Sequence, residues 1–142
     1  MVKARTRLRR GRNGRPFQSY QILFLLENET SIRIGALGRC SFPAGLYIYT
    51  GSARKHIEAR IRRHLAPSKC NRWHIDYLLS HPLARVVSTK RSSLEECVLN
   101  QRTRGRTIVR RLGASDCTQH CESHLKFIGK NRLRSATVQK RR

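Results

Sequence analysis

The chain has 142 residues, of which 38% are hydrophobic, enough for the core of one compact domain with tails but not for a membrane protein. Its longest apolar run, Ile22 to Leu26, is far too short to span a bilayer. Lysines and arginines number 31 against 8 aspartates and glutamates, and the formal net charge is +23. Such a charge attracts polyanions, so we expect nucleic acid as the partner and no membrane. The charge alone fits a basic ribosome-like or chromatin-like protein without chemistry equally well.

The five cysteines, at positions 40, 70, 97, 117 and 121, are an odd number and cannot all pair within one chain. A reducing compartment is the simpler interpretation. The basic start of the chain is not followed by the apolar segment and small-residue cleavage site of a secretory signal. We therefore expect a cytoplasmic protein, and an association with the nucleoid would be compatible with this location.

Basic residues interrupted by glycine and proline dominate both ends of the chain. This composition predicts a flexible basic arm over residues 1–17 and a similar tail over residues 130–142. Both ends are suited to binding phosphates. The folded domain is expected over residues 18–129.

The folded part opens with a short apolar run, Tyr20 to Leu26, which is typical of a buried strand. Thr30 to Ile34 alternates polar and apolar residues, so we expect it to pair back on the first strand as a hairpin. After glycine and proline breaks, Leu46 to Thr50 predicts a third strand, on which Tyr47 and Tyr49 share one face.

The next segments predict two helices and another strand. His56 to Leu65 has apolar residues at positions 57, 61 and 65, and this spacing of four predicts a buried helical stripe. Trp73 to Leu79 predicts a second, shorter helix. Leu83 to Thr89 predicts a fourth strand.

A third helix is expected from Leu94 to about Gln101. Ser92 and Ser93 each lie three residues before a glutamate, which is the pattern of a capping box. We prefer Ser92 as the cap, because this choice leaves Glu96 pointing inward. Weaker patterns allow final strands at residues 107–109 and 125–128. The order of elements predicts an α+β domain.

Residues suited to acid–base or phosphate chemistry recur after the third strand at definite spacings. Tyr49-Thr50-Gly51 ends the strand, and Arg60 and His64 lie one turn apart on the following helix. Glu96-Cys97-Val98-Leu99 places a glutamate near the start of a later helix. In this order the motifs resemble those of the GIY-YIG nuclease superfamily.

The resemblance is closest to a small branch of that superfamily that occurs alone or beside endonuclease III-type glycosylases. It covers about residues 19 to 128, where pieces of the branch occur in order. These pieces are Gly51-Ser52-Ala53, Arg60 to Leu65, Trp73 to Leu79, Glu96-Cys97, Ser115-Asp116-Cys117 and Ser123-His124-Leu125.

The resemblance implies a small three-stranded antiparallel β-sheet flanked by helices. It also implies an endonuclease that hydrolyses phosphodiester bonds in DNA with Mg²⁺ or Mn²⁺, in DNA repair or processing, with RNA as an open alternative. The chain departs from the superfamily at its first motif, because the expected Gly-Ile-Tyr reads Gln18-Ser19-Tyr20 here.

The resemblance assigns catalytic roles to five residues. Tyr20 acts as general base or relays the proton of the attacking water, and Tyr49 orients the water or Tyr20. Arg60 pairs with a phosphate oxygen, while His64 donates to phosphate or assists proton transfer. Glu96 holds the metal, since one carboxylate with waters and phosphate oxygens suits Mg²⁺. Phosphodiester hydrolysis needs these parts: a deprotonated water, a Lewis acid and support for developing charge.

Substrate contacts are expected close to these residues. Gly51 would allow the backbone to approach a phosphate. The other candidate substrate-binding residues are Ser52, Arg62, Arg63 and His74.

Each catalytic candidate also has a plainer interpretation. Tyr20 and Tyr49 fit ordinary strand tyrosines packed in a core. Arg60 fits a solvated arginine like its neighbours, and His64 fits a buried helix histidine. Glu96 fits the acidic residue of a capping box.

Soft metal ligands lie close together near the end of the domain. Cys117, Cys121 and His124 fall within one short stretch and could belong to a structural zinc site. Such a site needs a fourth ligand, for which Cys97, His120 and His74 are candidates. The alternative is a set of free thiols.

Two other functions compete with the nuclease. A catalytically inactive nucleic-acid-binding module of the same fold is favoured by the altered first motif. A purely structural basic protein of a ribonucleoprotein would need none of these residues at these spacings.

Overall fold

The computed structural model describes residues 10–11, 14–66, 71–114 and 117–130. The two ends predicted as basic arms, at residues 1–17 and 130–142, lie mostly outside the described residues. Within the first of them, Arg10 and Pro16 form an isolated antiparallel bridge.

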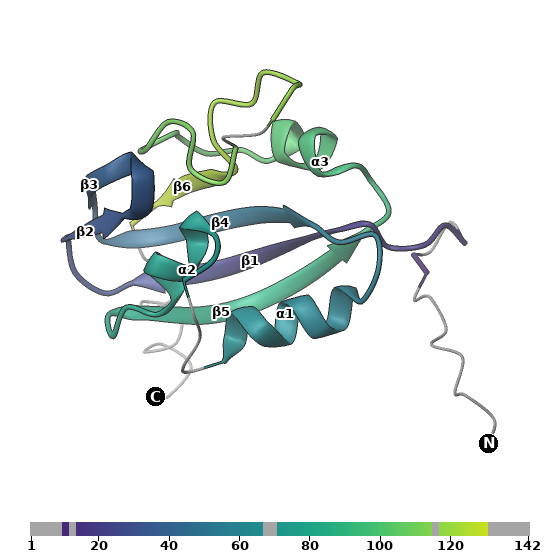
Figure 1. Ribbon diagram of the computed structural model, residues 1–142, viewed down its shortest axis with the longest axis horizontal. Helices are drawn as coiled ribbons and strands as arrows, with labels where there is room; N and C mark the ends of the chain where they lie inside the picture. Colours follow the sequence, from purple (N-terminus) through teal and green to yellow (C-terminus); the bar gives the residue numbers. More distant parts are fainter. Residues whose placement is uncertain (1–9, 12–13, 67–70, 115–116, 131–142) are drawn as a thin grey trace, which may run out of the picture.

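The described part of the chain alternates strands and short helices (Figure 1). In chain order the elements are β1 (Ser19–Leu26), β2 (Thr30–Ile34), a 3-10 turn (Gly35–Leu37), β3 (Gly38–Phe42), β4 (Gly45–Ser52), α1 (Ile57–Leu65), α2 (His74–Leu79), β5 (Ala84–Ser92), α3 (Glu96–Arg102) and β6 (Leu125–Gly129).

The main sheet has four strands in the order β5-β1-β4-β6, and each neighbouring pair is antiparallel. The α+β class predicted from the sequence is therefore confirmed. The expected three-stranded sheet was wrong, because β5 and β6 extend the central β1–β4 pair on both of its edges. The strand allowed at residues 125–128 forms as β6, and its pairing with β4 is short and contains a register shift.

The second strand does not form a hairpin with the first, contrary to the prediction. β2 pairs with β3 in a separate two-stranded sheet. Both edges of β1 are occupied by β4 and β5, which leaves it no free backbone groups for β2. The turn between β2 and β3 places Gly35 and Gly38 at φ values of 40° and 76°, a region that glycine tolerates best.

The hydrophobic core lies on one face of the main sheet. On β1 the side chains alternate between fully and partly buried, as expected for a strand with one core face. The fully buried ones are Tyr20, Ile22, Phe24 and Leu26. Figure 1 shows α1 and α2 in front of the sheet, and their Ile57, Ile61, Ile75 and Leu78 belong to the same core cluster.

Helix α1 presents a histidine to the core where the sequence predicted a leucine. Ile57 and Ile61 are buried as expected, but Leu65 is 48% exposed and His64 only 2%. Leu65 is the last residue of the helix, so the apolar stripe ends one turn early. His64 takes the inward position, where its ring meets Tyr20 and Tyr49.

Helix α3 begins at Glu96, two residues later than predicted, and the predicted capping box was wrong. Its N-cap is Glu95, with no side-chain cap. Ser92 ends β5 instead, and its hydroxyl accepts a hydrogen bond from the Leu94 amide. Ser19 also donates to the Leu94 carbonyl over 2.6 Å, which helps to hold this segment extended beside β1.

The strand allowed at residues 107–109 does not form. Arg106, just before that segment, makes an isolated bridge with Phe127 of β6, and the chain then bends and turns. The bridge places Arg106 beside the middle of β6.

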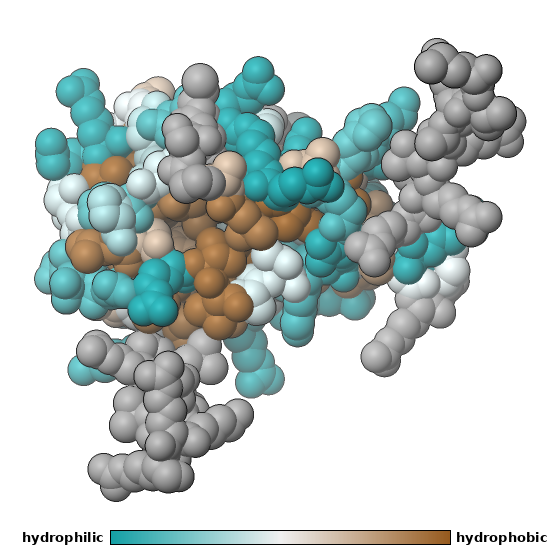
Figure 2. Space-filling model, turned by 90° about the horizontal axis from the view of Figure 1, so that it is seen from below, coloured by the Kyte–Doolittle hydropathy of each residue, from teal (hydrophilic) through white to brown (hydrophobic). Residues whose placement is uncertain are grey.

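The edge formed by β5 and α1 carries an apolar patch. Figure 2 views this edge and shows apolar side chains surrounded by hydrophilic ones. Leu65 on α1 and Val86 and Val87 on β5 are exposed large apolar residues. Among the residues that the structure describes, no helix combines the length and apolar character needed to cross a membrane.

Candidate functional site

Tyr20 lies at the centre of the candidate catalytic residues. It is paired with Gly51 across the β1–β4 ladder and is 2% exposed. A Cβ atom at position 51 would lie 2.5 Å from both Cζ and the hydroxyl oxygen of Tyr20. The space that the missing side chain of Gly51 leaves is thus occupied by the Tyr20 ring. From the sequence we had expected a phosphate to approach the backbone there.

The hydroxyl of Tyr20 is hydrogen-bonded to His64. The oxygen lies 2.6 Å from Nε2 of the imidazole, and both side chains are buried. Burial raises the pKa of Tyr20 well above its usual value, although the charge of Arg60 acts in the opposite direction. A neutral phenol whose proton points at a histidine nitrogen can pass that proton on.

Asp76 reaches the other side of the His64 ring. Its Oδ1 lies 3.7 Å from His64 Nδ1. A carboxylate at this position favours the tautomer that carries the proton on Nδ1, and that tautomer leaves Nε2 free to accept from Tyr20. Tyr20, His64 and Asp76 therefore form a line of three polar groups from β1 through α1 to α2.

Asp76 is itself tightly held and fully buried. Arg63 donates to its two oxygens over 3.0 and 3.1 Å, and the backbone amides of Arg72 and Trp73 donate over 2.8 and 2.9 Å. Burial alone would raise the pKa of Asp76, but these donors outweigh it and lower the pKa. Asp76 is a charged carboxylate that orients its neighbours.

Tyr49 completes the buried aromatic part of the cluster. Its ring centroid lies 6.4 Å from that of Tyr20 and 5.9 Å from that of His64. Burial raises its pKa well above the usual value, and the negative charges of Glu96 and Asp76 act in the same direction. Tyr49 therefore remains a neutral hydroxyl.

Arg60 stands at the more exposed side of this cluster. Its guanidinium donates to the backbone carbonyl of Ser52 over 2.7 Å and lies over the Trp73 ring, 5.0 Å from the centroid. Ser52 is exposed, and Arg60 is partly exposed. A cation held beside a strand end in this way is placed to meet an anion from solvent.

Glu96 joins the cluster from the first turn of α3. Its charge is close enough to raise the pKa of both Tyr20 and Tyr49. One carboxylate oxygen, Oε1, lies 2.9 Å from Nδ1 of His124. The side chain of Glu96 is 25% exposed, whereas that of His124 is 2% exposed.

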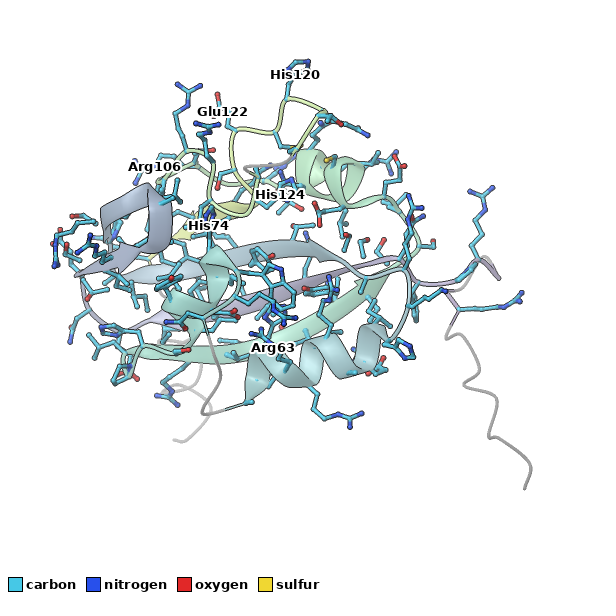
Figure 3. All side chains as sticks on the ribbon, viewed as in Figure 1. Arg63, His74, Arg106, His120, Glu122 and His124 are labelled. Atoms are coloured by element: carbon cyan, nitrogen blue, oxygen red, sulfur yellow. The ribbon has the colours of Figure 1, made fainter. Side chains whose placement is uncertain are left out.

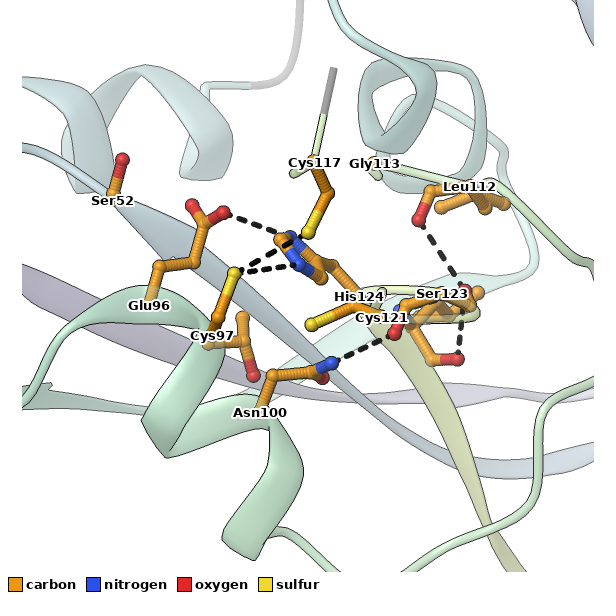
Figure 4. Close-up of polar contacts among 12 residues, drawn as sticks. Ser52, Glu96, Cys97, Asn100, Leu112, Gly113, Cys117, Cys121, Ser123 and His124 are labelled. Carbon is orange, nitrogen blue, oxygen red and sulfur yellow. Dashed lines mark hydrogen bonds and ion pairs between the residues drawn. The ribbon is translucent and has the colours of Figure 1, made fainter. Parts of the chain in front are cut away.

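Three cysteines and a histidine gather beside Glu96 (Figure 4). The ligand atoms of Cys97, Cys117, Cys121 and His124 all lie within 4.8 Å of one another, so these residues could hold a metal ion. Cys97 Sγ is 3.4 Å from Cys117 Sγ and 3.9 Å from His124 Nε2. Tetrahedral zinc would separate such ligand atoms by about 3.5–3.8 Å.

The thiols are electrostatically unequal. Burial raises the pKa of Cys97, and the neighbouring thiols raise it further. Burial also disfavours the thiolate of Cys117, but the backbone amides of Cys121 and Gln119 outweigh it and lower the pKa to about 7. Backbone donors aimed at a sulfur stabilise the thiolate form, which is the form that binds metals.

The structure selects Cys97 from the three candidates for the fourth ligand. His120 is exposed and points away from His124 in Figure 3. His74 accepts a hydrogen bond from the Gly113 amide at Nδ1, 3.0 Å away. Cys97 lies on α3, twenty residues before Cys117, so sequence spacing alone could not single it out.

The profile of one protein family, described as Domain of unknown function DUF123, matches residues 19–141. The chain belongs to this family. The DUF123 match takes in every described element from β1 to β6 and all the residues of the two clusters. Comparisons with curated proteins and with solved structures gave no match.

The fold brings together the five residues predicted to be catalytic: Tyr20, Tyr49, Arg60, His64 and Glu96. The proposed substrate contacts are more scattered. Arg63 is held by Asp76 and stacks on Trp73, 4.4 Å from the ring centroid, while Arg62 is exposed. His74 is engaged with the loop at Gly113.

Asp76 is the main residue of this site to which the sequence analysis gave no firm role. The available signal was its place three residues after Trp73, where an aspartate commonly accepts from the first amides of a helix. Its charge contact with His64 depends on how α1 and α2 pack and could not be deduced from spacing.

Proposed function

We propose that this protein is a metal-dependent endonuclease of the GIY-YIG type that hydrolyses phosphodiester bonds in DNA. The observation that carries the proposal is the convergence of Tyr20, Tyr49, Arg60, His64 and Glu96. These residues come from four different elements, β1, β4, α1 and α3. Aromatic packing alone would not place an arginine and a glutamate within electrostatic range of two tyrosine hydroxyls.

The proton of the attacking water leaves through Tyr20 and His64 in this mechanism. The 2.6 Å contact gives Tyr20 a partner that takes its proton as it accepts one from the water. This relay avoids a free phenolate, which the burial of Tyr20 disfavours. Asp76 then stabilises the positive charge that develops on His64.

Arg60 is the residue that meets the phosphate. Its contact with the Ser52 carbonyl uses one nitrogen, Nη1, and leaves further N–H groups of the planar guanidinium for an anion. A phosphate bound there would lie on the exposed side of the cluster, where charge grows in the transition state.

Glu96 is the carboxylate suited to hold Mg²⁺ or Mn²⁺. Asp76 is fully buried and engaged with Arg63, whereas Glu96 is partly exposed and has one oxygen, Oε2, beyond its contact with His124. One carboxylate with waters and phosphate oxygens is a usual ligand set for Mg²⁺. A bound divalent ion would supply Lewis acidity at the phosphate.

We assign zinc as the ion of the second cluster. Three thiols and one imidazole are soft and borderline ligands, and a closed set of four such ligands is typical of structural zinc. Hard oxygen-seeking ions such as Mg²⁺ would not choose this set. The purified protein should contain about one zinc ion per chain by elemental analysis.

The test of the proposed function is a cleavage assay on labelled DNA. Single strands, duplexes, forks, flaps and junctions are incubated with the full chain in Mg²⁺, Mn²⁺ or EDTA, beside RNA of the same sequences. Cutting that requires the divalent ion and is abolished in Arg60→Ala supports the nuclease. Salt-sensitive binding without cutting in any metal would instead favour the inactive binding module.

A further inference from the structure

Glu96 and Cys97 are consecutive residues that serve different clusters. Both lie in the first turn of α3. The charge of Glu96 raises the pKa of Tyr20 and Tyr49, whereas the sulfur of Cys97 lies among the other thiols. The first turn of α3 therefore connects the proposed catalytic residues around Tyr20 to the cysteine and histidine cluster.

The imidazole of His124 lies between these two residues. Its Nε2 faces the thiols, 3.9 Å from Cys97 Sγ, and its Nδ1 faces Glu96, 2.9 Å from Oε1. In Figure 4 the carboxylate of Glu96 reaches the ring from the side of Ser52. A metal-bound histidine commonly donates its second N–H to a carboxylate, which fixes the ring orientation.

His124 is also attached to the strand that carries Tyr49. Its backbone carbonyl accepts a hydrogen bond from the Thr50 amide over 2.9 Å. At Gly113 a Cβ atom would lie 3.1 Å from the Tyr49 ring and 3.3 Å from the His124 Cβ, so the three residues are closely packed. A change in the position of His124 would be felt at both Tyr49 and Glu96.

We propose that the two metal sites share Glu96, with Oε1 orienting the zinc ligand His124 and Oε2 directed to the ion of the nuclease reaction. This inference rests on the proposed function and adds a positioning role for the zinc centre. Zinc, by fixing His124 and Cys97, holds the reaction carboxylate in place. Removing zinc should therefore weaken nuclease activity although no zinc ligand touches the substrate.

The first arm of the test measures zinc affinity and needs no cleavage. Glu96→Ala is compared with Glu95→Ala, its exposed neighbour, by competition with a chromophoric zinc chelator. Loss of the carboxylate from a zinc-bound histidine should weaken zinc binding about 10- to 100-fold. Glu95→Ala should bind zinc like the unchanged chain, and equal affinities in all three proteins would overturn the shared carboxylate.

The second arm uses His124→Cys, which keeps four zinc ligands but removes the contact with Glu96. Zinc content should be retained, while the Mn²⁺ concentration for half-maximal cleavage rises at least about 10-fold. Retained zinc with unchanged Mn²⁺ dependence would overturn the positioning role.

The two arms also separate the inference from the proposed function. A full chain that cuts no nucleic acid in any metal contradicts the nuclease. The zinc-affinity comparison would still decide whether Glu96 supports His124.

Discussion

Arg60 and Arg62 are two arginines of one short helix with different surroundings. Arg60 is fixed between the Ser52 carbonyl and the Trp73 ring, whereas Arg62 is exposed. Arg60 is therefore a cation held in one position, whereas Arg62 contributes only to the general positive charge. Position rather than charge is therefore the quantity to test on α1.

We predict that Arg60→Ala lowers the single-turnover cleavage rate about 100- to 1000-fold, because in the proposed mechanism Arg60 donates to the charge of the transition state. Arg62→Ala removes the same charge and should change the rate less than about threefold. Rates are measured at saturating protein. Equal reductions in the two variants would mean that only net charge matters.

Asp76 predicts a pH dependence of stability. Its pKa is lowered in the folded protein, so its ion pair stabilises the fold above the ordinary carboxyl value of 3.8. That stabilisation is lost as the pH falls below this value toward the folded pKa. Asp76→Asn should therefore lower the free energy of unfolding by about 2 kcal/mol at neutral pH.

Urea unfolding at neutral and acidic pH measures this effect. The difference between Asp76→Asn and the unchanged chain should shrink as the pH falls below 3.8. A difference that stays constant with pH would show that Asp76 acts without its charge. The two proteins should keep similar denaturant slopes if they unfold to similar states.

The candidate site was more predictable from the sequence than its electrostatic support. Tyr49, Arg60 and His64 belong to local motifs, so a resemblance could find them. The contacts of Asp76 with Arg63 and His64 cross from α1 to α2, and no local pattern records that packing. The contact of Glu96 with His124 joins residues 28 positions apart and was missed for the same reason.

The β1–β4 pair is the element that places both tyrosines. The register sets Tyr20 opposite Gly51 and Ile22 opposite Tyr49, so the two phenols point to the same face. Among the described glycines, Gly51 is notable because the constraint on it is the Tyr20 ring, with no positive φ involved. The absence of a side chain at position 51 therefore makes room for the Tyr20 ring.

We predict that Gly51→Ala destabilises the fold by about 1–3 kcal/mol, because the new methyl group would overlap the Tyr20 ring. The ring must then move away from His64, so cleavage should fall as well. Ser52→Ala, at an exposed position on the same strand, is the control for stability. An unaltered midpoint of thermal unfolding in Gly51→Ala would show that the Tyr20 ring can move aside without loss of stability.

Element order was predictable, whereas strand partners were not. Alternation and apolar runs identified β1, β2, β4 and β5, because a strand with one buried face leaves a period of two in the sequence. That period does not say which edge a strand joins. β2 was assigned to β1, although its partner is β3. β3 itself was not predicted from the sequence, and its five residues begin with a glycine and then alternate exposed Arg39 and Ser41 with buried Cys40 and Phe42.

At the scale of the whole molecule, we expect DNA binding through positive charge to be separable from the proposed chemistry. The net charge is +23, and many of the basic residues lie in the terminal segments. Nucleic-acid affinity from phosphate contacts depends steeply on salt, while a catalytic rate at saturation does not depend on affinity. The terminal charges should therefore control binding and leave the chemical step unchanged.

We predict that replacing the basic residues of the tail by glutamine weakens DNA binding and flattens its dependence on salt. The replaced residues are Lys130, Arg132, Arg134, Lys140, Arg141 and Arg142. The slope of log affinity against log salt should fall by about 0.9 for each phosphate that the variant no longer neutralises. Fluorescence anisotropy measures the slope, and a large fall in the saturated cleavage rate would contradict this division of roles.

The measurement that tests the central claim most directly compares Tyr20→Phe with Tyr47→Phe in single-turnover cleavage. Each change removes one buried hydroxyl, because Tyr20 is bonded to His64 and Tyr47 donates to the Pro43 carbonyl, each over 2.6 Å. Only the first belongs to the proposed proton path. Tyr20→Phe should lower the rate at least about 100-fold, with Tyr47→Phe close to the unchanged chain. Equal rates in the two variants would contradict the assignment of a phosphodiester-hydrolysing site around Tyr20.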